Sequence, residues 1–263
     1  MLILSTPNGT FYEILSERSI TNMKQRESKG LLAIWADIDA DYRLTFEQWH
    51  NCEHINERVS IPGFYAGYRY ESIDRELHHL MFYEIKDSKA LGGSVYLHAL
   101  NHPTPRTQDA IVHFRNPIRA IYTLLWSSGK KPPKVAPYIS VSRFNIESGN
   151  DRETIKWFKE EYLPNITIIP GVNRGRLYEM DTEISNIKSE ELKIHKAGLG
   201  EQRFLAIYEM ESLKVATGKA WQEVKIGAVP LKKKLLQRLR DIHQELFWIN
   251  FSMLAPETHP SKR

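Results

Sequence analysis

Residues 49–71 read WHNCEHINERVSIPGFYAGYRYE, and residues 157–179 read WFKEEYLPNITIIPGVNRGRLYE. The two stretches align without a gap at a constant offset of 108 residues. Eight of the 23 aligned positions are identical, namely Trp49/Trp157, Glu53/Glu161, Ile61/Ile169, Pro62/Pro170, Gly63/Gly171, Gly67/Gly175, Tyr70/Tyr178 and Glu71/Glu179. A repeat with this period is too long for a solenoid unit, so it indicates two copies of one small domain.

The alignment resumes downstream at a different offset. Phe82–Glu84 (FYE) matches Ile207–Glu209 (IYE) at an offset of 125 residues, which exceeds the first offset by 125 − 108 = 17 residues. The second copy therefore carries an insertion of this length. We place the insertion in Asp181–Gly200, which is a polar stretch.

Each copy shows the pattern of a β-α-β-β-α-β unit. Leu31–Ile38 is an apolar run with a β-branched and aromatic bias, which is typical of a strand. Arg43–Val59 has apolar side chains at helical spacing, and the following Pro62 cannot continue a helix. The predicted strands are residues 31–38, 64–73, 77–85, 118–126, 137–146, 172–180, 203–210 and 246–254. The predicted helices are residues 43–59, 88–100, 152–164 and 213–225, and residues 101–106 are predicted to form a turn.

This order of elements is ferredoxin-like and predicts an α+β fold. A four-stranded antiparallel sheet with helices on one face leaves its other face bare. Two tandem ferredoxin-like repeats would cover each other and form an eight-stranded, barrel-like body within one chain. We expect an N-terminal extension (1–30), a first repeat (31–128), a linker (129–136), a second repeat (137–255) and a C-terminal tail (256–263).

Composition excludes several classes of protein. The 263 residues are 41% hydrophobic and 26% charged, which is typical of a globular chain. The net charge of +4 does not indicate a nucleic-acid partner, and the single cysteine, Cys52, excludes an internal disulfide framework. No apolar run approaches the ~18 residues of a membrane span. Residues 1–15 lack the basic start and long apolar core of a signal peptide. We therefore expect a soluble, cytoplasmic protein with no membrane partner.

The first copy resembles a known superfamily. Residues 49–58 follow the pattern WxxxEHxxER and are followed by Pro-Gly-Phe at residues 62–64, which is similar to the dimeric α/β-barrel superfamily and closest to its EthD-like branches. Residues 101–107 and 113–116 resemble segments of uncharacterised members. The resemblance implies the barrel fold and a range of activities: cofactor-free monooxygenases, isomerases, cyclases, lyases and haem-degrading enzymes. The second copy departs from the pattern, because Tyr162 and Ile166 replace the histidine and the arginine.

His54 is the main candidate for a catalytic residue. His50 and His54 align with Phe158 and Tyr162, which are side chains that a helix turns toward its sheet. An inward imidazole has a pKa that its surroundings can move across neutrality, as general acid–base catalysis requires. The alternative is a hydrogen-bonded structural histidine. Residues 50–54 also fit the metal-binding pattern HxxEH, but no third ligand is evident, so we expect neither a metal nor a cofactor.

Other polar and aromatic residues complete the predicted site. Arg58 and Arg115 are expected to hold an anionic or carbonyl oxygen, although Arg58 could equally complement the helix dipole. His113, also a candidate catalytic residue, lies with Asn116 where a pocket mouth is expected, or in a solvated loop. The remaining candidate substrate-binding residues, with core or surface roles as the alternative, are Trp49, His50, Tyr68, Tyr162 and Arg176.

Together these features favour a cofactor-independent enzyme of the lyase, isomerase or oxygenase type. Its substrate would be a small aromatic or carbonyl-bearing metabolite, with His54 as general acid or base. The alternatives are a non-catalytic small-molecule or haem-binding protein of the same fold and a purely architectural role. The expected partner is the small-molecule substrate. Self-association of the chain stays open, because a tandem chain can close its own barrel and still form oligomers.

Overall fold

The computed structural model describes residues 27–225 and 235–256. Most of the expected N-terminal extension and C-terminal tail therefore lies outside the described residues. The first half contains β1 (Gly30–Ile38), η1 (Ala40–Tyr42), α2 (Arg43–Trp49), η2 (His50–His54), α3 (Ile55–Val59), β2 (Phe64–Ser72), β3 (His78–Ile85), η3 (Ser88–Gly92), α4 (Ser94–Asn101), α5 (Pro105–Ile111) and β4 (Phe114–Gly129). The second half contains β5 (Tyr138–Ile146), α6 (Asp151–Trp157), η4 (Phe158–Tyr162), α7 (Leu163–Thr167), β6 (Val172–Met180), α8 (Thr182–Ser185), α9 (Glu190–His195), β7 (Phe204–Met210), α10 (Leu213–Thr217), α11 (Lys219–Lys225) and β8 (Leu239–Leu254).

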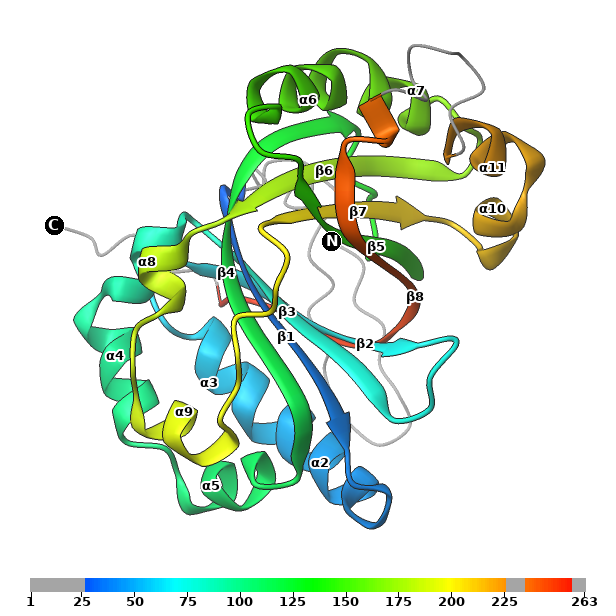
Figure 1. Ribbon diagram of the computed structural model, residues 1–263. Coiled ribbons are helices and arrows are strands. Elements are labelled where there is room, and N and C mark those ends of the chain that lie inside the picture. Colours follow the sequence, from blue (N-terminus) through cyan, green and yellow to red (C-terminus); the bar gives the residue numbers. More distant parts are fainter. Residues whose placement is uncertain (1–26, 226–234, 257–263) are drawn as a thin grey trace, which may run out of the picture.

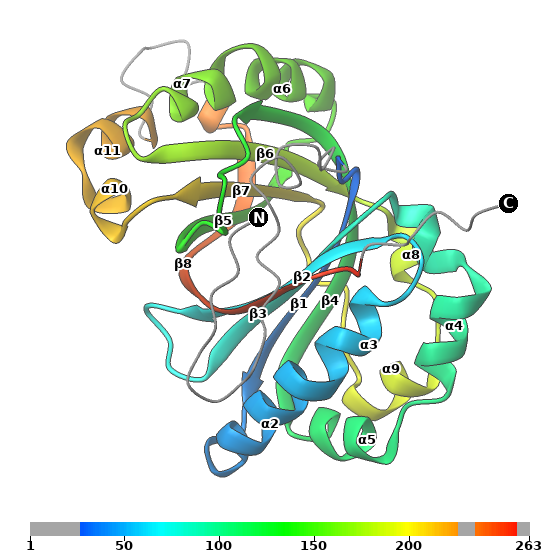
Figure 2. The same ribbon diagram turned by 180° about the vertical axis from the view of Figure 1, so that it is seen from behind.

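The eight strands close into one antiparallel barrel in the order β1-β3-β2-β8-β5-β7-β6-β4. Each half supplies four neighbouring strands in the ferredoxin-like order, and the halves join through the pairs β2–β8 and β4–β6. The helices lie outside the barrel in two groups, one with α6, α7, α10 and α11 and the other with α2 to α5 together with α8 and α9 (Figure 1). Seen from behind, α2 and α3 run along the strands of the first half, and α6 and α7 lie over those of the second (Figure 2). The predicted α+β, eight-stranded body is confirmed.

Strand alternation separates the lumen of the barrel from the space under the helices. On β1, Leu31, Ala33 and Trp35 belong to the core inside the barrel, whereas Leu32 packs against the helices. The lumen is filled by apolar side chains from both halves together with buried ion pairs of Arg176 with Glu84 and Glu209. It is therefore a packed core, and space for a ligand has to be sought between the sheet and the helices.

Two glycine positions are shared by the two halves, and at each position the structure favours glycine for the same reason in both halves. Gly63 and Gly171 have φ values of +99° and +86°, a conformation that side chains disfavour. A Cβ atom on Gly67 would lie 2.7 Å from Ile55, and one on Gly175 would lie 3.0 Å from Leu163. The helix thus packs directly on the second strand of each half.

Some predicted boundaries differ from the structure. Residues 105–111 form α5 rather than continuing a turn, because Pro105 occupies the first helical turn and the Thr104 side chain accepts a hydrogen bond from the Thr107 N–H. Strand β4 begins at Phe114, and β8 begins at Leu239, both earlier than expected. The helix expected over residues 213–225 is divided at Gly218 into α10 and α11.

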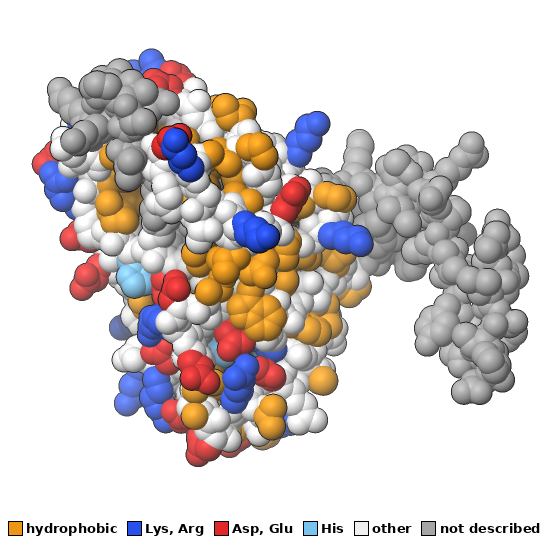
Figure 3. Space-filling view, turned by 90° about the vertical axis from the view of Figure 1, so that its right-hand side faces the viewer, with side chains coloured by type: hydrophobic (Ala, Val, Ile, Leu, Met, Phe, Trp, Pro, Cys, Tyr) orange, Lys and Arg blue, Asp and Glu red, His pale blue; other side chains and the backbone are white. Residues whose placement is uncertain are grey.

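Hydrophobic side chains gather in a band across the middle of the face shown in Figure 3, with charged side chains above and below. Large apolar side chains that are exposed in the described part of the chain include Trp248 and Leu254. Among the described residues, no helix combines the length and apolar composition needed to cross a membrane.

Candidate active site

A small cavity lies between the outer face of the first-half sheet and the surrounding helices. Its volume is about 40 Å³, which corresponds to about three water molecules. Its apolar wall is formed by Leu32, Ile34, Trp49, Met81, Leu100, Ile111, Phe114 and Leu192. Its polar side chains are His54, Arg58, Tyr83, Tyr96, Arg119, Glu191 and His195. The cavity is therefore mostly apolar and has a few convergent polar groups, as small-molecule sites commonly have.

A π-helical turn places His54 in this cavity. The turn η2 spans His50–His54, and its counterpart η4 spans Phe158–Tyr162, exactly one repeat offset later. Such turns are rare and often occur at functional sites. In the first half the turn presents His54 to the cavity, and the side chain of His54 is 13% exposed.

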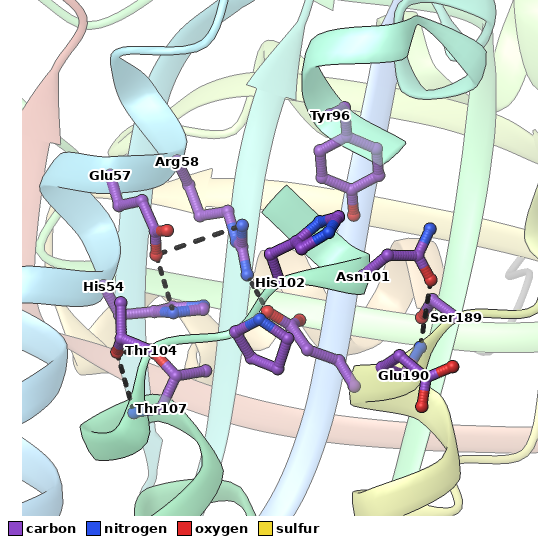
Figure 4. A network of polar contacts seen from close by, with 12 residues as sticks. His54, Glu57, Arg58, Tyr96, Asn101, His102, Thr104, Thr107, Ser189 and Glu190 are labelled. Atoms are coloured by element: carbon purple, nitrogen blue, oxygen red, sulfur yellow. Dashed lines mark hydrogen bonds and ion pairs between the residues drawn. The ribbon is translucent and has the colours of Figure 1, made fainter. Parts of the chain in front are cut away.

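The imidazole of His54 has few polar contacts of its own. Its ring lies 4.4 Å from that of Trp49, and its Nδ1 lies 3.9 Å from Glu57 Oε2 without a hydrogen bond (Figure 4). Burial lowers the pKa of His54 well below its usual value, and the nearby Arg58 adds to this. The imidazole is therefore neutral near pH 7 and can accept a proton.

Arg58 is buried one helical turn beyond His54. It forms an ion pair with Glu191 of α9, and its Nη1 lies 4.0 Å from Glu57 Oε2 (Figure 4). Although burial alone would lower it, the Glu191 carboxylate raises the pKa of Arg58, so the guanidinium stays charged. The Nη1 atom of Arg58 has no hydrogen-bond partner. One donor of this cation is thus free for a further acceptor.

Arg119 and two tyrosines, Tyr83 and Tyr96, also line the cavity. The Nη2 atom of Arg119 donates to the hydroxyl of Tyr96 at 3.1 Å, while its Nη1 atom is buried without a partner. The Tyr83 hydroxyl lies 3.4 Å from His50 Nε2. Burial raises the pKa of Tyr83, so its hydroxyl stays protonated. None of these three lining residues was identified from the sequence, although Arg119 occupies an outward position on a predicted strand.

The insertion closes the cavity. The first part of β4 pairs with β1, but its other edge has no strand neighbour until β6 begins to pair at Tyr122. The insertion covers this edge: the Asp181 N–H donates to Ile121 O at 2.8 Å, and the Arg119 N–H donates to Gly198 O at 2.8 Å. Between these anchors, α8 and α9 lie beside α4 and α5 (Figure 1).

Helix α9 supplies three lining residues, Glu191, Leu192 and His195. Burial lowers the pKa of His195 to about 4, and Arg119 adds to this. The sequence located the insertion but gave it no role in the site. The available signal was the i, i+4 spacing of Glu191 and His195, which places both on one face of a helix.

The structure brings three of the predicted site residues to the cavity: Trp49, His54 and Arg58. His50 is fully buried beside it, behind the Tyr83 hydroxyl. Among the described residues, no group of three or more His, Cys, Asp or Glu side chains is placed to hold a metal ion.

Tyr68 and Arg176 lie instead inside the barrel. Tyr68 belongs to the apolar core of the lumen, and its hydroxyl lies 3.5 Å from Glu84. Arg176 donates to Glu84 and to Glu209, in each case at 2.8 Å. Alternation along the strands predicted which residues share a face of the sheet. In the structure, the face that carries Tyr68 and Arg176 lines the lumen of the barrel and not the cavity.

His113, Arg115 and Asn116 lie beyond the cavity, at the end where β1 and β4 meet. His113 Nδ1 lies 3.0 Å from Asp39 Oδ2, and its ring stacks on Tyr42 at 3.8 Å. Arg115 also pairs with Asp39, and half of its side chain is exposed. Asn116 donates to Asp37 at 3.2 Å. Their polar groups are thus engaged at this rim rather than in the cavity.

Tyr162 lies in the core of the second half. Its ring packs 4.8 Å from that of Trp157, and the cluster around it includes Phe158, Tyr208 and Trp221. The position equivalent to His54 is thus occupied by a side chain of the hydrophobic core.

The fold recurs in solved structures. An anthrone oxidase-like protein matches with a TM-score of 0.59 and 10% identity, over 91% of this chain and 98% of that chain. A putative monooxygenase from Fusobacterium nucleatum matches with a TM-score of 0.54 and 9% identity, over 86% and 95% of the two chains. Another, from Lactobacillus acidophilus, matches with a TM-score of 0.55 and 8% identity, over 87% and 97%.

The chain has the fold of the dimeric α/β-barrel superfamily. No protein-family model matches its sequence, and no curated protein is detectably similar to it. The identity of 8–10% to these solved structures is too low to transfer a reaction, since one fold carries many chemistries. Function has to be argued from the cavity itself.

Proposed function

We propose that this dimeric α/β-barrel protein is a cofactor-independent enzyme that acts on a small carbonyl-bearing or aromatic molecule bound in the first-half cavity. One observation carries the proposal. A neutral imidazole, that of His54, lies in a mostly apolar cavity together with two guanidinium groups, Arg58 and Arg119, that each have an unpartnered buried nitrogen. Perturbed titratable groups in a cavity are typical of functional sites.

In the proposed reaction, His54 removes a proton from a C–H bond next to a carbonyl. The bonding electrons move onto the carbonyl oxygen, and the imidazole becomes an imidazolium. The resulting oxyanion accepts hydrogen bonds from Arg58 and Arg119, which stabilises the transition state. Return of the proton to another atom completes an isomerisation, and its transfer to a departing group completes an elimination. An oxygenase reaction of the same anion would need dioxygen as a co-reactant.

We also propose that the two halves arose by tandem duplication, with the repeats at residues 31–128 and 137–255 joined by a linker at 129–136. The constant offset of 108 residues, the ferredoxin-like strand order that both halves share and the matched π-helical turns support this. The duplication matters for function because the two copies then diverged at positions 54 and 162.

The test is deuterium exchange into a panel of small carbonyl compounds in D₂O, followed by ¹H NMR. We expect the protein to accelerate exchange of at least one C–H acid in the panel. His54→Gln should lower that rate by about 10²–10⁴-fold, the range typical of general base catalysis. The matched control is His102→Gln, which changes an exposed histidine of the same half.

Equal exchange rates in the protein and in His54→Gln would contradict the proposed reaction. If ligands still bind to both, the protein is the non-catalytic binding protein that the sequence left as the alternative. The haem form of that alternative is tested by the visible absorbance of the purified protein.

A further inference from the structure

Glu191 is an unusual lining residue, because it reaches the cavity from the insertion that only the second half carries. Its carboxylate is buried and bonds to Arg58, a residue 133 positions earlier in the chain. Arg119 lines the same cavity, and its charge, like that of Arg58, acts on the Glu191 carboxylate. Both arginines keep an unpartnered buried Nη1 atom, so two guanidinium donors at the cavity are left without an acceptor.

We propose that Arg58 and Arg119 form a binding site for the carboxylate of a small substrate, and that the carboxylate of Glu191 occupies this site until the substrate displaces it. The inference rests on the proposed function in that it concerns the same cavity. It names the substrate class: a monocarboxylate, or a planar oxyanion of like shape, attached to a short apolar group. A planar guanidinium matches such an anion by paired hydrogen bonds.

The walls of the cavity fit the rest of such a molecule. Leu32, Ile34 and Phe114 offer no hydrogen bonds, so the group next to the carboxylate is apolar. The present volume of about 40 Å³ admits only a few atoms. When the side chain of Glu191 leaves, its own volume is added to the cavity at the position where the substrate carboxylate binds.

The attachment of α9 allows this displacement. The insertion is held to β4 at both ends through Asp181 and Gly198, whereas α9 between these ends is a helix of only six residues. Its first turn is tied to α4 by one hydrogen bond, from the Glu190 N–H to Asn101 Oδ1 at 3.2 Å (Figure 4). Withdrawal of Glu191 therefore leaves the pairing of the barrel strands intact.

Chemical rescue tests the site directly. In Glu191→Ala, the buried Arg58 loses its partner, so the variant should melt at a lower temperature than the unmodified protein. Added propionate should restore the melting temperature, whereas propionamide, which has the same shape without the charge, should not. We expect Glu191→Ala to bind propionate about tenfold or more tightly than the unmodified protein, because the anion no longer competes with a charge-assisted hydrogen bond.

The matched control is Glu190→Ala, which removes the same charge from the same helix but from an exposed side chain paired with Lys193. It should respond to propionate as the unmodified protein does. In the double variant Glu191→Ala with Arg58→Gln, rescue should disappear. Sodium chloride at equal ionic strength separates a general salt effect from binding.

Equal responses of Glu191→Ala and Glu190→Ala, equal rescue by propionamide, or rescue that survives Arg58→Gln would each overturn the inference. If Glu191→Ala does not fold without an anion, the isosteric Glu191→Gln is used, with the same tenfold expectation. The outcome is separate from that of the catalytic proposal, because His54→Gln should leave propionate rescue unchanged. If propionate rescues Glu191→Ala but the protein does not accelerate proton exchange, only the catalytic role of His54 is contradicted. If the protein accelerates proton exchange but propionate does not rescue Glu191→Ala, only this anion site is contradicted.

Discussion

The two halves of the barrel use the same helical turn in different ways. In the first half, η2 carries His50 and His54 and borders a cavity that contains charged groups. In the second half, η4 carries Phe158 and Tyr162, and both are buried among aromatic side chains. The backbone is alike in both, so the difference lies in the side chains. The same backbone turn contributes to a hydrophobic core in the second half and borders a polar cavity in the first.

The tyrosines at equivalent positions of the third strands make the comparison sharper. Tyr83 of β3 reaches His50, whereas Tyr208 of β7 shares a hydrogen bond with Tyr162 and packs against Trp221 at 5.3 Å. Each tyrosine thus meets the π-helical turn of its own half. The partner is the first residue of the turn, His50, in the first half and the last residue, Tyr162, in the second.

The largest expected effect comes from making the first half like the second. His54→Tyr places the second-half residue at the candidate site and removes the proposed base. Proton exchange should fall by about 10²–10⁴-fold, while overpacking lowers the free energy of unfolding by only about 1–3 kcal/mol. Exchange by NMR and urea unfolding measure the two effects. Retained exchange in a folded His54→Tyr protein would place the chemistry elsewhere.

The second-largest effect concerns the tryptophan that both halves share. Trp49 and Trp157 precede the two π-helical turns and are 1% and 4% exposed. Trp49→Ala and Trp157→Ala should each lower the free energy of unfolding by roughly 3–5 kcal/mol, because both leave a cavity in a packed core. Denaturant unfolding provides the measurement. A large loss in one half only would argue against a shared architectural role.

The reverse exchange has a smaller effect. Tyr162→His should bury an imidazole among Phe158, Trp157 and Tyr208, with poor hydrogen bonding, and should cost about 1–3 kcal/mol of stability. It should not create proton-exchange activity, because the second half has Ile166 where the first has Arg58. Tyr162→Phe serves as the control that keeps the ring. Activity in Tyr162→His would show that the charged neighbours are dispensable.

The pH dependence of stability gives the smallest effect for each group. Burial, helped by Arg69, lowers the pKa of His79 to about 3, whereas an unfolded histidine titrates near 6.5. Below pH 6.5 the unfolded state binds more protons than the folded state. The contribution of the neutral His79 to the free energy of unfolding is therefore complete above pH 6.5 and is lost as the pH falls. The slope is at most about 1.4 kcal/mol per pH unit for each such histidine.

Urea unfolding between pH 7 and 5 measures this slope. Burial lowers the pKa of His50 and His54 as well, so several first-half histidines contribute in the same direction. His79→Gln should flatten the slope, and His102→Gln, at an exposed histidine, is the matched control variant. An unchanged slope in His79→Gln would mean that His79 titrates normally in the folded protein.

Much of the fold followed from the sequence, because repeat identity and strand alternation are local signals. The repeat predicted eight strands and the position of the long helices. It missed α5, although Thr104 and Pro105 provide a clear helix start, because two prolines were interpreted as a turn. The start of β4 at Phe114 depends on pairing with β1, which is a long-range contact.

The candidate site was predictable only where one helix carries it. The repeat assigned His50 and His54 to an inward helical face, and Trp49 and Arg58 belong to the same predicted helix, residues 43–59. Arg119, Glu191 and His195 come from β4 and the insertion, and only closure of the barrel brings them together. For Tyr68 and Arg176, alternation established a shared face but could not say which of the two faces meets the cavity.

The most direct test of the account is ¹⁵N NMR titration of the His54 imidazole, assigned by comparison with His54→Gln. The account predicts that His54 remains neutral well below pH 6.5 and that its resonances shift when propionate is added. The exposed His102 is the control residue in the same sample and should not respond to propionate. A His54 that becomes charged near pH 6.5 and ignores the ligand would contradict a buried, one-sided site in the first half of the barrel.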